Sequence, residues 1–292
     1  MEHGMQSSDF FSALAGVRLL ALDLDGTVLT NAKRLTPRTA AAISAAVEAG
    51  LIPVAVTGRP LSGIPAAVAA IPGMRYVISS NGAVTTDLLS GERMRAALLS
   101  PAEAIEIAQL PIERGLIHSV FIGGIGYCEP EFFRQQWAFF RSRPLAAYVK
   151  KSRRAVPDLR ARTLGSDGVE NVWLIARSTD ERNELDAIIR AGWNVQTSLT
   201  AAYDVEVGHP EADKGLAVLE LARSLGIARE QILAIGDNGN DLGMLRAAGL
   251  SVAMSNATED VLRIADYVTD SNEDDGAAKI LEAILASSGR AL

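Results

Sequence analysis

Short apolar runs that end in polar residues recur along the chain and alternate with segments of helical periodicity. An apolar run of this length, bounded by turn residues, is typical of a strand buried on both faces of a parallel sheet. We expect such strands at residues 19–23, 51–56, 76–79, 231–235, 250–254 and 267–269. Helical patterns occur at residues 38–49, 64–70, 214–225, 242–248, 259–264 and 276–286. This alternation predicts an α/β fold with a doubly wound parallel sheet.

The middle of the chain has a different pattern. From Asp87 to Val207, predicted helices and strands follow one another in a mixed order, and the block has enough apolar residues for a core of its own. We therefore expect an α+β domain, residues 87–207, inserted into a main domain formed by residues 16–86 and 208–292. Residues 1–15 are expected to form a loose leader.

Composition and charge exclude several classes of function. Hydrophobic residues make up 48% of the chain and charged residues 22%, which is ordinary for a globular protein. The formal net charge of −7 argues against nucleic acid or an anionic membrane as the main partner, although a bound metal can still attract a phosphorylated substrate. No apolar run is long enough to span a membrane, and the N-terminus does not resemble a signal peptide. The single cysteine, Cys128, fits a reducing compartment, so we expect a cytoplasmic protein of undetermined oligomeric state.

Asp23 and Asp25 follow the first predicted strand, and Gly26 then turns the chain. Side chains two residues apart lie on the same side of an extended strand end, so the two carboxylates are expected to lie close together. Carboxylates so close repel each other unless a cation lies between them or one is protonated. Mg²⁺ prefers oxygen ligands and retains several waters, which suits such a site. The alternative is an ordinary Asp-Gly turn after a strand.

Further polar clusters stand at the ends of other predicted strands and at the start of a helix. They are Thr57-Gly58-Arg59, Ser80-Asn81-Gly82, Lys214-Gly215 and the run from Gly236 to Asp241. Taken singly, each could be a turn, a surface loop or a solvated lysine. In an open α/β sheet, ligands bind at the carboxyl ends of the strands, so clusters at several of these ends predict one shared site.

The same residues resemble the motifs of a known family. Asp23-Leu24-Asp25-Gly26-Thr27 is similar to the first motif of the haloacid dehalogenase superfamily, Asp-x-Asp-Gly-Thr. The second, third and fourth motifs are resembled by Thr57, Lys214 and Gly236-Asp237-Asn238-Gly239-Asn240-Asp241. The residues around Thr57, Asn81 and Lys214 are similar to the Cof-like branch, which carries a C2B-type cap between the second and third motifs. The resemblance covers about Val17 to Ala286; Gly239 and Gly243 depart from it, because larger residues often stand there.

The resemblance implies a mechanism in which Asp23 attacks phosphorus and forms an aspartyl-phosphate. Asp25 would protonate the leaving oxygen and later deprotonate the attacking water. Mg²⁺ would be bound by Asp23, by the backbone carbonyl of Asp25 and by Asp237. Asp241 would hold Lys214 or a water of the ion's hydration shell.

The remaining motif residues would bind the phosphate. Thr57 and the Gly58 amide would donate hydrogen bonds to the phosphoryl oxygens, and Lys214 would offset their charge. The resemblance also implies that Arg59, Asn81 and Asn240 touch the phosphate or the near end of the substrate.

The implied function is a Mg²⁺-dependent phosphatase that hydrolyses small phosphorylated metabolites, such as sugar phosphates, pyridoxal phosphate or flavin mononucleotide. Aspartate at position 25 favours this over the related transport ATPases, which carry threonine there, and over dehalogenases, which lack the acid and the metal. One alternative is a phosphomutase of the phosphomannomutase type, which needs a cationic cap pocket for a second phosphate; no arginine cluster of that kind is evident in the inserted block. A non-catalytic phosphoester-binding protein is the other alternative, although such a protein would usually have lost a motif residue.

Substrate choice would fall to the inserted block. Side chains there that could face the substrate are His118, Tyr127, Arg134, Trp137 and Trp173, although aromatic residues more often pack in a core. The basic run from Lys150 to Arg154 could attract an anionic substrate, although a solvated loop is the simpler interpretation.

Overall fold

The computed structural model describes residues 7–139, 143–199 and 202–287. Within these ranges, eight strands form a first sheet in the order β14-β13-β12-β1-β2-β3-β4-β5. Its strands are β1 (Leu19–Asp23), β2 (Ile52–Val56), β3 (Tyr76–Ser79), β4 (Val84–Asp87), β5 (Arg93–Ala96), β12 (Ile232–Gly236), β13 (Leu250–Met254) and β14 (Tyr267–Thr269). Neighbours from β14 to β3 are parallel, and β4 and β5 add an antiparallel edge. The predicted α/β fold with a parallel core sheet is confirmed.

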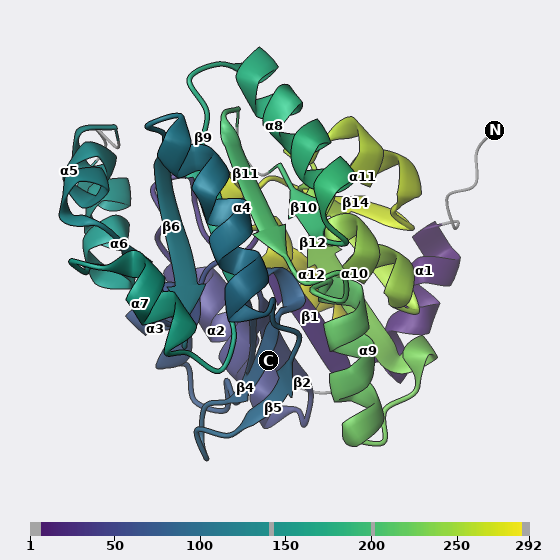
Figure 1. Cartoon of the computed structure of the whole chain (residues 1–292). Helices are drawn as coiled ribbons and strands as arrows, with labels where there is room; N and C mark the ends of the chain where they lie inside the picture. Colours follow the sequence, from purple (N-terminus) through teal and green to yellow (C-terminus); the bar gives the residue numbers. More distant parts are fainter. Residues whose placement is uncertain (1–6, 140–142, 200–201, 288–292) are drawn as a thin grey trace.

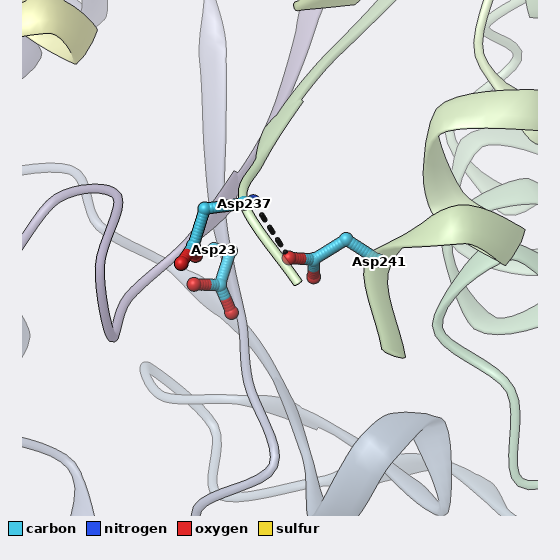
Figure 2. Close-up of side chains that lie close together, drawn as sticks. All are labelled: Asp23, Asp237 and Asp241. Carbon is cyan, nitrogen blue, oxygen red and sulfur yellow. Dashed lines mark hydrogen bonds between the residues drawn. The ribbon is translucent and has the colours of Figure 1, made fainter. Parts of the chain in front are cut away.

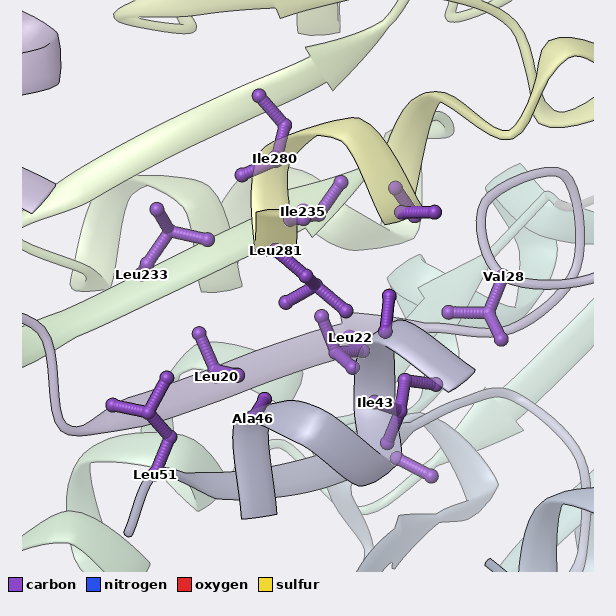
Figure 3. Packing of buried hydrophobic residues seen from close by; sticks show 14 of the residues in the cluster. Leu20, Leu22, Val28, Ile43, Ala46, Leu51, Leu233, Ile235, Ile280 and Leu281 are labelled. Atoms are coloured by element: carbon purple, nitrogen blue, oxygen red, sulfur yellow. The ribbon is translucent and has the colours of Figure 1, made fainter. Parts of the chain in front are cut away.

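Helices cover both faces of this sheet, because alternate residues of its buried strands point to opposite sides. Leu20 and Leu22 of β1 pack in one cluster with α2 (Pro37–Glu48) and α12 (Gly276–Ser287), as Figure 3 shows. Leu19 and Ala21 pack on the opposite face with α9 (Lys214–Ser224), α10 (Leu242–Ala247) and α11 (Glu259–Ile264). The strands are therefore closed to solvent on both faces, and the strand ends are left to carry polar side chains. The connections between these elements contain short helical segments: η2 (Leu61–Gly63), α3 (Ala66–Ala69), η3 (Ser80–Gly82), η4 (Arg229–Gln231), η5 (Gly239–Asp241) and η6 (Asn272–Asp274).

A second, mixed sheet is built from the middle of the chain, in the order β10-β11-β9-β6-β7-β8. Its strands are β6 (Ile117–Ile122), β7 (Ile125–Cys128), β8 (Arg153–Ala155), β9 (Asn171–Ile175), β10 (Gln196–Ser198) and β11 (Asp204–Gly208). The helices of this block are α4 (Pro101–Glu113), α5 (Pro130–Phe139), α6 (Arg143–Ser152), α7 (Leu159–Leu164) and α8 (Thr179–Gly192). One face of the sheet packs against α4, α7 and α8 in a separate apolar core. Figure 1 shows this cap, drawn mainly in blue and teal, next to the first sheet.

The cap begins later than the sequence pattern predicts. β5 pairs with β4 in the first sheet, although residues 93–96 fall in the range assigned to the insertion. This edge strand is mostly exposed and reads Arg-Met-Arg-Ala, so it lacks the continuous apolar run by which the buried strands are recognised. The basic run at Lys150–Arg154 is also not an irregular loop, because it forms the end of α6 and the start of β8.

The expected loose leader is wrong for the residues that the structure describes. Ser7–Ala13 form helix α1, which continues as η1 (Leu14–Gly16). Phe10 and Leu14, one helical turn apart, are fully buried in the first core, and Phe10 stacks on Tyr267 with ring centroids 4.7 Å apart. A helix this short is not stable alone, so its presence depends on tertiary contacts that a sequence pattern does not reveal.

Truncation of Phe10 is expected to destabilise the whole core domain. Phe10→Ala should lower the free energy of unfolding by about 3 kcal/mol, because it removes a fully buried ring and leaves a cavity beside Tyr267. Urea unfolding monitored by circular dichroism measures this. The matched control is Phe11→Ala, since Phe11 is 38% exposed and should cost about 1 kcal/mol or less. Equal losses for the two variants would contradict the docking of α1.

No helix of the described ranges has both the length and the apolar character needed to cross a membrane.

Candidate active site

The predicted polar clusters lie together at the carboxyl ends of four parallel strands that are neighbours in the first sheet, β12, β1, β2 and β3. Asp23 is the last residue of β1, and its side chain is buried. Lys214 is the first residue of α9, and its Nζ donates to Asp23 Oδ1 at 2.7 Å and to Asp241 Oδ1 at 2.6 Å. The structure therefore brings together residues that are 191 positions apart in the chain.

Three carboxylates, those of Asp23, Asp237 and Asp241, lie in a cluster in which one oxygen from each is within 4.8 Å of the others (Figure 2). Asp241 has its oxygens engaged: Oδ1 accepts from Lys214, and Oδ2 accepts from the backbone amides of Asp237 (2.9 Å) and Asn238 (3.0 Å). Asp241 thus acts as a fixed support between the lysine and the loop after β12. Asp23 and Asp237 face each other with fewer protein partners.

The electrostatics of this cluster favour a bound cation. Burial, together with the nearby Asp241 carboxylate, raises the pKa of Asp23 well above its usual range. Burial and Asp241 likewise raise the pKa of Asp237 to about 7. Burial alone would lower the pKa of Lys214, but its two carboxylate partners raise it above the usual value. Buried carboxylates with a surplus of negative charge are a hard oxygen donor set that fits a divalent cation such as Mg²⁺.

The turn after β1 explains the glycine of the first motif. Gly26 has a φ of +90°, and a Cβ built there would lie 2.3 Å from Asp237 Oδ2. Only glycine allows the turn to approach the Asp237 carboxylate so closely. The next residue, Thr27, donates its hydroxyl to Asp237 Oδ1 at 3.1 Å. The Asp-Gly-Thr sequence therefore serves to place Asp237.

Asp25 has different partners from those that the resemblance implies. Its carboxylate accepts from Arg59 Nε at 2.5 Å and from Arg59 Nη2 at 2.7 Å, and Lys33 Nζ lies 2.9 Å away. Burial alone would raise the pKa of Asp25, but Arg59 and Lys33 lower it to about 2. Arg59, expected at the substrate, is thus engaged by Asp25, and the Asp25 side chain stands outside the three-carboxylate cluster.

The loops after β2 and β3 are tied together by backbone and side-chain hydrogen bonds. Thr57 is buried, and its hydroxyl accepts from the Arg59 amide at 3.2 Å, while its carbonyl accepts from the Asn81 amide at 3.1 Å. Asn81 has a φ of +55°, a conformation that asparagine tolerates better than most residues. Its Oδ1 accepts from Asn240 Nδ2 at 2.9 Å, and it also packs against Gly58. Gly58, Asn81 and Asn240 therefore belong to one connected rim of the site.

Two glutamates of the cap complete this rim, and the sequence analysis missed both. Glu206 of β11 accepts a hydrogen bond from Asn81 Nδ2. Glu170 is buried and accepts from Ser80 Oγ at 2.8 Å and from the Gly124 amide at 2.7 Å. The alternation Asp204-Val205-Glu206-Val207 indicates a strand with one polar face, but not that this face meets the loops of another domain.

The burial of Glu206 beside Asp204 is expected to make stability depend on pH. Burial, with the nearby Asp204 carboxylate, raises the pKa of Glu206 to about 8 from a usual 4.5. Between these values the folded state binds more protons than the unfolded state, so this group's contribution to stability falls as pH rises from 4.5 to 8.

Replacement of Glu206 by glutamine is expected to remove that pH dependence. Glu206→Gln should melt close to the wild type at about pH 5 and several degrees above it at about pH 9, because the amide keeps the hydrogen bond without a charge. Differential scanning fluorimetry measures both. Glu211→Gln, at an exposed position nearby, is the control and should follow the wild type. A melting difference independent of pH would contradict the titration of Glu206.

The cap side chains named from the sequence have varied positions. His118 is fully buried, with Nδ1 2.9 Å from the Leu116 carbonyl oxygen and Nε2 3.3 Å from Glu129. The Arg162 guanidinium lies over the Tyr127 ring, and Arg134 is exposed on α5. The side chain of Trp137 lies outside the described residues.

Trp173 of β9 and Arg153 of β8 pack together in the cap. The Arg153 guanidinium lies 4.7 Å from the centre of the Trp173 ring and also contacts the rings of Phe121 and Tyr148. Arg153 is buried, with 3% of its surface exposed, so this member of the basic run does not belong to a solvated loop. Its side chain stabilises the packing of three aromatic rings on the sheet face that carries Glu206.

Comparisons with known proteins agree with this arrangement. The model of the haloacid dehalogenase-like hydrolase family matches residues 20–281. The putative phosphatase YxeH of Bacillus subtilis is 30% identical over 277 residues, which cover 92% of this chain and 99% of the relative. The 5-amino-6-(5-phospho-D-ribitylamino)uracil phosphatase YcsE of the same organism is 26% identical, covering 91% and 94%. A haloacid dehalogenase-like hydrolase from Bacteroides thetaiotaomicron, of known crystal structure, superposes with a TM-score of 0.79 at 26% identity, covering 92% and 99%.

Proposed function

Because the chain belongs to the haloacid dehalogenase-like hydrolases and is a phosphatase of that family, we propose that it hydrolyses phosphate monoesters of small metabolites through an aspartyl-phosphate on Asp23. The observation that carries this proposal is the position of Asp23, a buried carboxylate at the end of β1 between Lys214 and Asp237. A carboxylate in this setting can act as a nucleophile once the charge of the incoming phosphate is offset.

Mg²⁺ is the proposed cofactor, held by the carboxylates of Asp23 and Asp237 and by the backbone carbonyl of Asp25. When bound, the ion would offset the negative charge of the transferring phosphoryl group. The surplus of negative charge in the three-carboxylate cluster supports this assignment.

Lys214 is proposed to orient the carboxylate of Asp23 and to favour its ionised form. Its ammonium group bridges Asp23 and Asp241, which favours the ionised form of Asp23 and fixes the orientation of its carboxylate. Asp241 is itself held by two backbone amides, so the partner that positions the lysine is fixed to the loop after β12. We infer that the hydroxyl of Thr57 and the Gly58 amide donate hydrogen bonds to the phosphoryl oxygens.

Asp25 is proposed as the group that moves the proton. In its pairing with Arg59 and Lys33 the carboxylate is ionised, which suits a base that accepts a proton from the attacking water. As an acid toward the leaving oxygen it must first gain a proton. Phosphate oxygens that compete for Arg59 and Lys33 would raise its pKa and permit this.

The substrate class that we propose is sugar phosphates or phosphorylated cofactors such as pyridoxal phosphate and flavin mononucleotide. The relative YcsE supports this range, because it is a phosphatase of 5-amino-6-(5-phospho-D-ribitylamino)uracil, a compound phosphorylated on a ribityl chain. The test is release of inorganic phosphate from a panel of hexose phosphates, polyol phosphates, nucleotides, pyridoxal phosphate and flavin mononucleotide with Mg²⁺. Release from one class supports the proposal.

Absence of release across the panel, and from p-nitrophenyl phosphate, would overturn the proposed hydrolysis. Incubation of a hexose 1-phosphate with its 1,6-bisphosphate would then test the phosphomutase alternative by formation of the 6-phosphate. If neither reaction occurs, calorimetric binding of the same esters would test the non-catalytic alternative.

A further inference from the structure

A cavity of about 390 Å³ opens beside Lys214, between the cap and the core. Its lining includes Lys214, which contacts Asp23, and Asn81 and Asn240 of the rim. Its other walls come from β10 of the cap and from the start of α10 in the core. A phosphate bound at Asp23 would therefore have the rest of its substrate in reach of this cavity.

Two arginines from different domains line the same cavity. Arg190 comes from α8 of the cap, and Arg246 comes from α10 of the core. Arg190 is ion-paired through Nε with Asp186 at 2.9 Å, while the Arg246 guanidinium has no ion-pair partner among the residues that the structure describes. One acidic side chain, Asp213, also lines the cavity, but its carboxylate accepts from the Leu216 amide at 2.9 Å and caps α9. The lining thus carries three basic side chains, Arg190, Lys214 and Arg246, and one acidic side chain, whereas the chain as a whole has a net charge of −7.

Gly239 is one of the residues that line the cavity. Residues larger than glycine often stand at this position in the motif that the chain resembles. A Cβ built on Gly239 would have no atom within 4 Å, so the space that a side chain would fill is open. Its neighbour Asn240 lines the cavity as well. In contrast, a Cβ at Gly243 would lie 2.3 Å from Asp213 Oδ2, so that glycine serves packing.

We propose that this cavity binds the leaving group of the substrate and that Arg190 and Arg246 recognise an acidic group at its far end. The substrate would then be a phosphate monoester that carries a second anion, either a carboxylate or another phosphate. The inference rests on the proposed function for the position of the scissile phosphate. Arginine suits either anion, because its planar guanidinium donates two parallel hydrogen bonds to carboxylate or phosphate oxygens.

The experiment compares three acyclic esters that differ only at the far end. Sorbitol 6-phosphate has a hydroxymethyl group there, 6-phosphogluconate a carboxylate, and sorbitol 1,6-bisphosphate a second phosphate. Binding is measured by calorimetry on the Asp23→Asn protein with Mg²⁺, and kcat/KM on the protein with Asp23 intact. We expect at least one acidic ester to bind about tenfold more tightly than sorbitol 6-phosphate, since a charge-assisted hydrogen bond has about this effect. The preferred ester identifies which anion is recognised.

Substitution of the arginines should remove the preference and nothing else. Arg190→Gln and Arg246→Gln are each expected to lose most of the tenfold preference, while affinity for sorbitol 6-phosphate stays unchanged. Arg223→Gln, on an exposed part of α9, is the matched control and should keep the preference. Gly239→Met should weaken binding of all three six-carbon esters and spare turnover of acetyl phosphate, whose leaving group is small.

Failure of this inference can be told apart from failure of the proposed function. Equal affinities for the three esters, equal effects of the arginine substitutions on all of them, or no binding of any ester would overturn the second-anion site, even if phosphate is released from other substrates. Loss of the proposed function would instead be seen as absence of phosphate release from every ester. The calorimetric preference does not depend on turnover, so it tests the second-anion site in either case.

Discussion

Asp23→Asn is expected to lower kcat by at least about 10⁴-fold, because the amide cannot attack phosphorus and no other carboxylate takes its place. Asp237 lies in the same cluster but is the proposed metal ligand, and Asp241 is held by Lys214 and two amides. Initial rates of phosphate release with Mg²⁺ measure the effect. The fold should be kept, since asparagine has the same shape and Lys214 retains Asp241 as a partner.

Thermal stability gives a second readout of the same substitution. Burial and like charge raise the pKa of Asp23, so removal of its charge should leave the melting temperature of the metal-free protein unchanged or raise it. The matched control is Asp87→Asn, which alters a buried carboxylate of the same sheet that pairs with Arg75 and should keep full activity. If Asp23→Asn retained more than about 1% of the activity, the assignment of Asp23 as nucleophile would be wrong.

Removal of divalent metal should abolish activity, and Mg²⁺ should restore it. Without the cation, the cluster of Asp23, Asp237 and Asp241 repels the incoming phosphate and the nucleophile cannot reach phosphorus. Ca²⁺ should not restore the rate, since it is larger and takes more ligands at longer distances. Treatment with EDTA, dialysis and readdition of each ion test this. Full rates with Ca²⁺ would contradict the metal assignment.

The same metal should be visible without turnover. Mg²⁺ at about one hundred times its dissociation constant should stabilise the folded state by about 2.7 kcal/mol, which raises the melting temperature by several degrees. Asp237→Asn should remove most of this shift, because it deletes one of the two proposed carboxylate ligands. Asp260→Asn, at an exposed carboxylate paired with Arg263, should keep the shift. A shift that survives Asp237→Asn would place the metal elsewhere.

Local patterns in the sequence predicted the frame of the core correctly. The run Leu19–Leu22 is apolar at every position, so it forms a strand that is buried on both faces. Asp23 follows this run and is the first charged residue, at the carboxyl end of the strand. Residues 38–49 are expected to be helical, and α2 begins at Pro37, where Thr36 accepts a hydrogen bond from the Thr39 amide. Such signals depend on residues that are neighbours in the sequence, so a short window of the chain is enough to detect them.

Contacts between distant segments decided what these patterns left open. Asp25 pairs with Arg59 and Lys33. Helix α1 is held on the core in part by the stacking of Phe10 on Tyr267. Glu206 of the cap accepts a hydrogen bond from Asn81 of the core. A short helix, an edge strand or one face of a strand gains its free energy from tertiary packing, so its sequence alone carries little information about its partner. The sequence by itself therefore determined which segments form the parallel core strands and which residues are available for chemistry. Only the tertiary structure decided which charges pair, which face of the cap meets the site and which arginines line its cavity. These contacts join residues that are far apart in the sequence, so they form only when the chain folds.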